Sequence, residues 1–372
     1  MPDPDHLTDA MPATMDNDIT DHLTEQVHSA IGSKTALVIR GGGSKQRLGR
    51  ACDGTPLDVG GHRGVVNYQP KELVITARCG TPLALIEQTL AEHGQQLPFE
   101  PPHLDGDQPG TATIGGTIAC GLSGPARQYA GAARDLVLGT RVLTGHGQVL
   151  RFGGEVMKNV AGYDISRLMT GAYGTLGLLL DVSLKVLPIP AAEHTLIQER
   201  DAATALRLMA DWARRPLPIT ATCFDGDRLH VRISGAETAV GQAAADIGGE
   251  PSPDSATFWR ERIREQRHGF FTGDAPLWRL SVPPTTPPLD LPGKQLIEWG
   301  GGQRWLRTDA EPRPIRAVVE AVGGHATLFR GGDRRGEVFH PLPPGLLTLH
   351  RNLKQAFDPL GIFNRGRMYV DV

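Results

Sequence analysis

The chain has 372 residues, a formal net charge of −3 at pH 7, and 40% hydrophobic residues. This balance lacks the basic excess with which proteins contact nucleic-acid phosphates, so we expect no nucleic-acid partner. No apolar stretch approaches the about 20 residues that span a bilayer. We therefore expect contact with a membrane only peripherally or through partners. The length suffices for two domains with separate cores.

The first 18 residues are rich in Asp, Pro, Thr and Met, and no Lys or Arg precedes Lys34. A signal peptide has the opposite pattern, a basic start followed by an apolar segment. We interpret residues 1–18 as a disordered acidic tail. We expect a cytoplasmic protein, attached at most to the inner face of the cytoplasmic membrane.

The four cysteines, Cys52, Cys79, Cys120 and Cys223, lie far apart and form no CxxC pair. Zinc sites and iron–sulfur clusters need closely spaced thiolates or histidines. The sequence therefore predicts no metal site, and we expect reduced, mostly buried thiols.

An amphipathic helix is expected over 19–34, with Leu23, Val27 and Ala30 on its apolar face. A strand over 36–40 leads into the glycine-rich sequence RGGGSK, where a cation and a hydroxyl follow three glycines. Neither GxxxxGK[ST] nor GxGxxG occurs, which disfavours Walker and Rossmann loops. A strand over 73–78 follows, then a helix that Thr81 caps and Gly94 ends.

Residues 110–186 contain three glycine clusters at the ends of short apolar runs: Gly115 with Gly116, Gly121 with Gly124, and Gly171 with Gly174 and Gly177. Glycine lets backbone N–H groups converge on an anion or a flat ring. Any single cluster is also explained by a tight turn. Between the clusters we expect a hairpin of strands 135–143 and 149–152, a short helix capped by Asp164, and a buried strand after Gly177.

After Pro190 the pattern changes to strands and helices in ferredoxin-like order. We expect strands over 195–198, 220–224, 229–233, 277–282, 295–298, 303–307 and 327–329, and helices over 202–213, 237–247, 315–322 and 346–357. The charge-dense stretch 260–267 is typical of a solvated helix face.

The order RGGGSK, PGTATIGGTIACGLSG, DLVLGTRVLTGHGQVLRFGG and KNVAGYDISRLMTGAYGTLGLLLDVSLKV resembles the FAD-binding domain of the vanillyl-alcohol oxidase/PCMH superfamily. The chain is most similar to the smaller FAD-binding subunits of bacterial glycolate oxidases. The resemblance covers about residues 19–190, with a further piece at the C-terminus. It implies an α+β protein: a PCMH-type FAD-binding domain of two α/β subdomains (19–190), a ferredoxin-like α+β cap domain (191–345), and a C-terminal helix and segment (346–372) that return to the flavin.

The resemblance also implies which residues hold FAD. The pyrophosphate would be wrapped by Arg40, Gly41, Gly42, Gly43, Ser44, Lys45 and Gln46. The ribityl chain and ring edge would be lined by Pro109, Gly110, Thr111, Gly115, Gly116, Ala119, Gly121, Ser123 and Gly124. The adenosine end would lie near Gly171, Gly174, Gly177 and Leu178, and Asn364 would contact the flavin edge. Arg367 is either an anion contact or part of a simple C-terminal turn. A Cβ at Gly42 or Gly116 would occupy space that the cofactor needs.

One departure from the family pattern bears on how the flavin is held. Members with covalent flavin carry a histidine in the first glycine-rich loop, where this chain has Ser44 and Lys45. We therefore expect FAD to be bound non-covalently. His62, His93 and His103 are nearby in sequence and are interpreted as ordinary surface residues.

The GDGN-x-H segment that supplies catalytic histidines in related hydroxy-acid dehydrogenases is missing, so the catalytic residues are unknown. The leading interpretation is an FAD-binding subunit of a glycolate oxidase complex, with a catalytic FAD-linked subunit and an iron–sulfur subunit as partners. One alternative is a self-sufficient FAD-dependent dehydrogenase of a 2-hydroxy acid or sugar lactone. Another is a structural subunit without flavin, which the intact glycines disfavour.

Overall fold

The computed structural model describes residues 16–106, 108, 110–154 and 163–372. Most of the predicted acidic tail lies outside these residues. Its last three residues are ordered by contacts, contrary to our expectation: Asn17 exchanges backbone hydrogen bonds with Arg63, and Asp16 pairs with Arg78 at 3.1 Å. The arginine provides a charge partner that the tail itself lacks.

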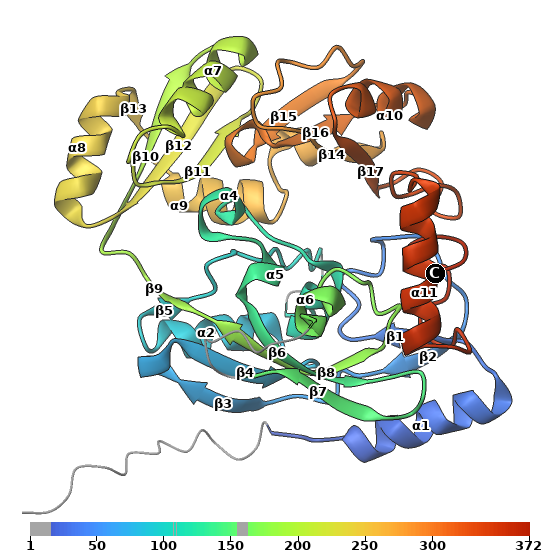
Figure 1. Ribbon diagram of the computed structural model, residues 1–372. Helices are drawn as coiled ribbons and strands as arrows, with labels where there is room; N and C mark the ends of the chain where they lie inside the picture. The colour runs from blue at the N-terminus through green and yellow to red at the C-terminus, as the bar shows by residue number, and fades with distance from the viewer. Residues whose placement is uncertain (1–15, 107, 109, 155–162) are drawn as a thin grey trace, which may run out of the picture.

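The N-terminal half, residues 16–188, is built on a five-stranded antiparallel sheet (Figure 1). Its strands lie in the order β3 (Val65–Gln69), β4 (Val74–Arg78), β8 (Leu178–Lys185), β6 (Val137–Leu143) and β7 (Val149–Gly153). Two small sheets accompany it: the parallel pair β1 (Leu37–Arg40) and β2 (Thr55–Asp58), and the pair β5 (Gln95–Gln96) and β9 (Leu187–Pro188). The helices are α1 (Thr20–Ser33), α2 (Leu83–Ala91), α3 (Ile114–Cys120), α4 (Arg127–Ala130), α5 (Ala133–Leu136) and α6 (Ile165–Met169).

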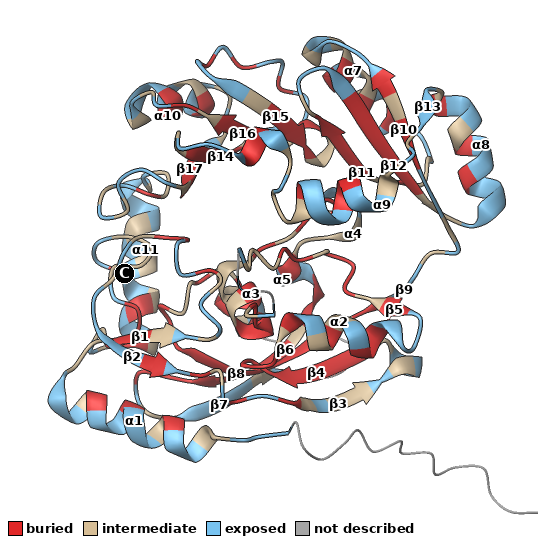
Figure 2. Cartoon of the chain, turned by 180° about the vertical axis from the view of Figure 1, so that it is seen from behind, coloured by how far each residue is buried: buried red, intermediate tan, exposed pale blue. Residues whose placement is uncertain are grey.

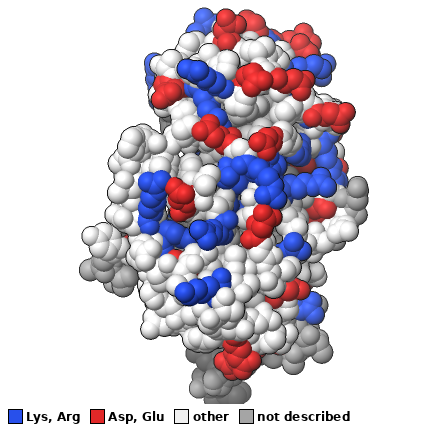
Figure 3. Space-filling model, turned by 90° about the vertical axis from the view of Figure 1, so that its right-hand side faces the viewer, with Lys and Arg blue, Asp and Glu red and all other residues white. Residues whose placement is uncertain are grey.

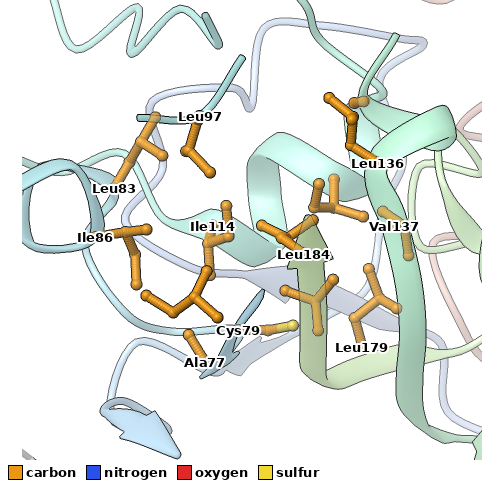
Figure 4. Packing of buried hydrophobic residues seen from close by; sticks show 14 of the residues in the cluster. Ala77, Cys79, Leu83, Ile86, Leu97, Ile114, Leu136, Val137, Leu179 and Leu184 are labelled. Atoms are coloured by element: carbon orange, nitrogen blue, oxygen red, sulfur yellow. The ribbon is translucent and has the colours of Figure 1, made fainter. Parts of the chain in front are cut away.

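The core of this half lies between the sheet and helices α2 and α3 (Figure 4). Leu83 and Ile86 of α2 and Ile114 of α3 are fully buried against strand residues such as Ala77 and Leu184. Strand β8 has seven buried residues in succession because it is central in the sheet and is covered on both faces. It begins directly after Gly177, so the last glycine cluster leads into the centre of the sheet.

The cap, residues 192–330, contains one eight-stranded sheet that covers the N-terminal half from above (Figure 1). Its strands lie in the order β13 (Glu250–Pro251), β10 (Ala192–Glu199), β12 (Arg228–Gly235), β11 (Ile219–Phe224), β15 (Lys294–Glu298), β16 (Gln303–Arg307), β14 (Leu277–Ser281) and β17 (His325–Arg330). With α7 (Ala202–Trp212) and α8 (Glu237–Ile247), the first four strands have ferredoxin-like order. The other four, with α10 (Pro312–Ala321), repeat that order without the first helix, so the cap is two such units joined by the pairing of β11 with β15.

Buried residues run along the strands of both halves (Figure 2), and the two halves also share a buried apolar cluster. Leu48 and Leu122 of the N-terminal half pack with Phe258, Trp305 and Phe329 of the cap. This contact fixes the cap over the glycine-rich loops, because its apolar surface is removed from water on both sides. The last helix, α11 (Pro344–Phe357), runs along one side of the molecule and returns the C-terminal segment to β1 (Figure 1).

Two local expectations were wrong, and a third was right only for part of its stretch. The cap of α2 is Pro82 without a side-chain hydrogen bond, because the Thr81 hydroxyl bonds the backbone of Gly64 instead. The segment with Gly115 and Gly116 is the short helix α3, with Thr113 as its cap. The charge-dense stretch 260–267 exposes Arg260, Glu261, Arg262 and Arg267, as expected of a solvated face. It begins in the π-helical turn η2 (Phe258–Arg264), whose apolar residues are buried and whose Arg264 pairs across the halves with Glu87.

Candidate functional site

A cleft opens where the glycine-rich segments meet beneath the cap. It lies at the end of β1, the start of α3 and the start of β8. Its wall contains fourteen of the residues that the sequence nominated: Arg40, Gly41, Gly42, Gly43, Ser44, Lys45, Gln46, Gly115, Gly116, Ala119, Gly174, Gly177, Leu178 and Asn364. Segments separated by more than 300 residues in the sequence therefore form one wall.

The loop after β1 presents a row of unpaired donors to this cleft. Within the described parts of the chain, no hydrogen bond uses the backbone N–H groups of residues 41–45. Lys45 is buried and Gly41 and Ser44 are half-buried, whereas Gly42 and Gly43 are exposed and can donate to water. Because buried N–H groups normally have partners, the free donors of the first three residues indicate a site for an external acceptor. Oxygen atoms of a phosphate are acceptors of this kind.

The glycines around the cleft serve two different purposes. A Cβ at Gly116 would meet only Thr113 Oγ1 at 3.3 Å and the Lys45 side chain at 3.9 Å, so this position is open toward the cleft. A Cβ at Gly42 would lie 1.6 Å from the carbonyl oxygen of Thr111. Our reason for Gly42 was therefore incomplete, because the protein's own backbone already requires glycine there.

Lys45 is the one lysine among the described residues that line this cleft. It is 6% exposed, and its Nζ donates to the carbonyl oxygen of His103 at 2.9 Å and to Ser44 Oγ at 3.1 Å. Burial lowers the pKa of the Lys45 ammonium, and the nearby Asp105 and Glu265 partly oppose that shift. A buried ammonium with one donor still uncommitted is suited to an anionic ligand.

Asn364 ties the C-terminal segment to the cleft. Its Oδ1 accepts from the N–H of Ile39 at 2.8 Å, and its Nδ2 donates to the carbonyl oxygen of Tyr173 at 2.7 Å. The backbone φ of 40° is one that Asn tolerates better than most residues. The amide thus fastens β1 to the Gly171–Gly177 turn, and its position in the wall follows from this fastening.

A buried ion pair holds that segment in place. The Lys354 Nζ donates to Asp358 Oδ2 at 2.7 Å and to the carbonyl oxygens of Thr175 and Phe363. Asp358 in turn accepts from the N–H groups of Ile362 and Phe363. The Lys354 ammonium thus has three acceptors, and both carboxylate oxygens of Asp358 have donors. A buried ion pair is tolerated when its polar atoms are hydrogen-bonded in this way.

The sequence did not point to several residues in the wall: Ile39, Val59, Cys79, Thr113, Cys120, Tyr173 and Leu179. Tyr173 has a positive φ of 55° and is half-buried, and desolvation raises the pKa of its phenol to about 12. Its position inside a glycine-rich turn was the available signal, since a bulky residue between glycines is held there by tertiary contacts. Arg367, the weaker candidate, is also in the wall and donates to the carbonyl oxygen of Gln46 at 2.7 Å.

The other nominated residues that the structure describes lie outside the cleft wall. Pro109 is outside the described residues, and Gly110 and Thr111 contact the Asp105 carboxylate instead. Ser123 accepts a hydrogen bond from the N–H of Ala133. Gly121 and Gly171 pack against each other, with a Cβ at Gly121 placed 3.1 Å from the Gly171 Cα, and Gly124 packs on the backbone of Glu100. Close backbone packing explains glycine at these positions without a ligand.

Among the lining residues of the cleft there is no histidine. His62 is buried beside Asp181 at 3.3 Å, and His103 pairs with Glu87 at 2.9 Å, so both differ from the surface residues we expected.

Lys and Arg side chains gather across the middle of the face shown in Figure 3. Three arginines hold the 46–52 segment against the C-terminal part of the chain. Arg50 donates to the carbonyl oxygen of Gly366, Arg334 to that of Gly49, and Arg367 to that of Gln46.

Comparison with known proteins agrees with this geometry. Residues 19–153 match the family model of an FAD binding domain. The chain is 50% identical over 355 residues to glycolate oxidase subunit GlcE of Escherichia coli (strain K12), covering 95% of this chain and 99% of that protein. The chain belongs to the GlcE family.

More distant relatives mark the limits of that similarity. Glycolate oxidase subunit GlcD of Bacillus subtilis is 28% identical over 221 residues, covering 57% of this chain and 45% of GlcD. A solved structure of alkyldihydroxyacetonephosphate synthase has a TM-score of 0.65 at 14% identity, over 92% of this chain and 75% of that one. It shows the fold alone, and the α+β fold class predicted from the sequence is confirmed.

The residues present fit FAD, the cofactor named by the family model. Free N–H groups of residues 41–45 and the Lys45 ammonium suit its phosphates, and the open face at Gly116 leaves room for a flat or extended group.

The part of the chain described here has no helix long and apolar enough to cross a membrane.

Proposed function

We propose that this chain is the FAD-binding subunit of a glycolate oxidase complex. In that complex, this chain acts together with a catalytic FAD-linked subunit and an iron–sulfur subunit to oxidise glycolate to glyoxylate. The observation that carries the proposal is the row of five unpaired N–H groups in a chain that is 50% identical to GlcE. The cofactor cleft also argues against a purely structural subunit.

FAD, when bound, supplies the capacity to accept a hydride and to pass electrons on. The residues of this chain bind and enclose it: the 41–45 loop and Lys45 hold the anionic part, and Tyr173 and Asn364 close the wall. A dehydrogenase also needs a group that removes the substrate's hydroxyl proton. The wall residues include no carboxylate and no histidine, and the Lys45 Nζ is engaged with Ser44 and His103. This favours an accessory role over a self-sufficient dehydrogenase.

The mode of flavin attachment can be tested on the purified chain. We expect acid precipitation to leave the flavin in a yellow supernatant, because the wall contains no histidine that could link to it. A covalent bond would survive denaturation. Flavin that remained in the pellet would show that it is held covalently and would overturn the expected non-covalent binding.

The accessory role is tested by anaerobic stopped-flow mixing of the FAD-loaded chain with glycolate or D-lactate. We expect no rapid bleaching of the flavin and no dye reduction by the chain alone. Activity should appear after reconstitution with a GlcD-type flavoprotein and an iron–sulfur subunit. Rapid bleaching without partners would overturn the proposal in favour of the self-sufficient dehydrogenase.

A further inference from the structure

The last helix, α11, is covered only loosely by the rest of the molecule. Lys354 is its one buried residue, and the rest of the helix is exposed or half-buried (Figure 2). An apolar stripe nevertheless runs along one face, because helical spacing separates Leu346, Leu349, Leu353 and Phe357. A helix with that face in water would have polar residues there, so the apolar stripe indicates a packing partner.

Only the C-terminal half of the apolar stripe has such a partner within the chain. Leu353 and Phe357 pack partly against the core of the N-terminal half. Leu346 is 43% exposed and Leu349 is 52% exposed. Of the ten large hydrophobic side chains that the described residues expose, four follow residue 345: Leu346, Leu349, Leu360 and Val370. Single exposed hydrophobic residues are ordinary, whereas such a concentration marks an interaction surface.

The charge around this helix is mostly positive. α11 contains no Asp or Glu, and the two aspartates that follow it pair with Lys354 and Arg351 on the helix. Four guanidiniums beside the helix have no carboxylate at ion-pair distance within the described ranges of the chain: Arg50, Arg334, Arg365 and Arg367. The side of the molecule that carries α11 in Figure 1 faces the viewer in Figure 3, where Lys and Arg gather across the middle.

Contacts with the C-terminal segment keep these arginines close to one another and to the helix. Arg50 Nε donates to the Gly366 carbonyl oxygen at 3.0 Å. Burial lowers the pKa of Arg334 to about 10, and the charge of Arg367 adds to this shift. Burial also lowers the pKa of Lys354 on α11, with a contribution from Arg365. Like charges held together raise the energy of the free surface, and an acidic partner would lower it.

The same segment forms part of the cofactor cleft. α11 leads directly into residues 358–367, and Asn364 and Arg367 are in the cleft wall. The Lys354 Nζ fastens the helix to that wall through the carbonyl oxygens of Thr175 and Phe363. A protein that docks on α11 therefore lies next to the cofactor site.

The charge decides among three occupants of this surface. A second copy of the chain would place its own arginines against these, and like charges opposed across an interface are costly. A flavoprotein holds its phosphates inside a cleft lined by N–H groups, away from its surface. An iron–sulfur cluster held by four thiolates is anionic overall, so the protein that carries it brings negative charge with its redox centre.

We propose that the exposed part of the apolar stripe, together with the arginines beside it, is the docking surface of this chain for the iron–sulfur subunit. α11 lies in an apolar groove of that subunit, as amphipathic helices do in other complexes, and carboxylates at the rim of the groove face Arg365 and its neighbours. This inference rests on the proposed function, because it states where one partner of the same complex binds.

Leu346→Glu and Leu349→Glu test the apolar stripe. Each should weaken binding of the purified iron–sulfur subunit to the FAD-loaded full chain at least about tenfold, because a carboxylate would be buried in an apolar contact. Leu150→Glu is the matched control, since Leu150 is 38% exposed on β7, and it should bind as wild type does. Calorimetric titration measures the affinity, and flavin absorbance with circular dichroism checks folding and loading. Wild-type affinity in both α11 variants would overturn the proposal.

Arg365→Glu tests the charge beside the helix. We expect about fivefold weaker binding at low salt and no difference from wild type at about 1 M salt, where the screening length is about 3 Å. Arg207→Glu, an exposed substitution on α7, is the control and should leave the affinity unchanged. Unchanged binding by Arg365→Glu at low salt would refute the acidic rim.

Parallel measurements identify the occupant. Leu349→Glu should bind the catalytic FAD-linked subunit as wild type does, and loss of that subunit alone would assign α11 to it and overturn the proposal. Light scattering should show no dimer of the chain that Leu349→Glu dissociates, since such a dimer would assign the surface to a second copy. A wild-type chain that binds neither subunit would contradict the proposed function itself. An active complex that both leucine variants leave intact would contradict only this inference.

Discussion

Two glycine-rich segments with similar composition have opposite surroundings. The 41–45 loop has free N–H groups and faces the cofactor cleft. In the 121–124 turn, the Gly124 N–H donates to the carbonyl oxygen of Phe99 at 2.8 Å, and the Gly124 carbonyl accepts from the Trp299 Nε1 at 3.0 Å. The N–H groups of the first segment have no partner within the described residues, whereas the second segment is part of the joint between the N-terminal half and the cap. The role of each segment therefore depends on whether its backbone N–H and carbonyl groups have partners within the protein. The number of glycines does not decide it.

The largest expected effect tests the closed segment. Gly124→Ala would place a Cβ 2.1 Å from the carbonyl oxygen of Glu100. We expect a loss of about 4 kcal/mol in the free energy of unfolding, for apoprotein and FAD-loaded protein alike, because backbone must move. Urea denaturation of both forms measures it. A stable variant that had lost only its flavin would place this turn in the cofactor site.

The joint should also respond to pH through Glu298, which lies beside Trp299. Burial raises the pKa of Glu298 from 4.5 to about 7, although hydrogen bonds from Trp305 and Gln303 favour its charged form. The folded state therefore binds more protons than the unfolded state between these values, and stability falls as pH rises through this window. Relative to Glu298→Gln, the wild type should lose up to about 3 kcal/mol between pH 4.5 and 7.

Denaturation of both proteins across that range measures the Glu298 effect. Glu320→Gln, an exposed substitution on α10, serves as the control and should run parallel to wild type. Parallel curves for Glu298→Gln and wild type would mean that this carboxyl titrates normally.

Gly116→Val tests the open segment. The added methyl groups would extend toward the cleft, where only Thr113 Oγ1 and the Lys45 Cδ are near. We expect FAD affinity to fall at least about tenfold, while the unfolding free energy of the apoprotein changes by less than about 1 kcal/mol. Flavin titration and denaturation of the apoprotein measure the two quantities. Normal flavin affinity would mean that this face does not contact the cofactor.

The smallest expected effect concerns a single bond across the joint. Trp299→Phe removes the indole N–H that donates to Gly124 but keeps an aromatic face for Arg127, whose guanidinium lies 4.6 Å from the ring centre. We expect a loss of about 1 kcal/mol in stability and no change in FAD affinity. The same denaturation and titration assays apply. A change in flavin affinity instead would connect this turn to the cofactor cleft.

Sequence patterns alone determined the elements whose signals are local. Helix 237–247 and strand 303–307 have the predicted bounds, and Leu23, Val27 and Ala30 are the buried face of α1. The first glycine-rich loop was recognised because a strand end, three glycines and a lysine are adjacent in the chain. Periodicity and turn chemistry act over a few residues, so they can be read without the fold.

Tertiary structure decided which glycines face a ligand, because that depends on segments far away in the sequence. Gly42 and Gly124 are required by the backbone at Thr111 and Glu100, and Gly116 is not similarly obstructed. It also decided the fusion of two ferredoxin-like units into one sheet, which rests on the pairing of β11 with β15, and the proximity of Arg47 and Arg307 to Arg330, which lowers the pKa of Arg330 after burial does. Long-range pairing and the loss of water around charges arise only when distant segments meet, so no local pattern records them.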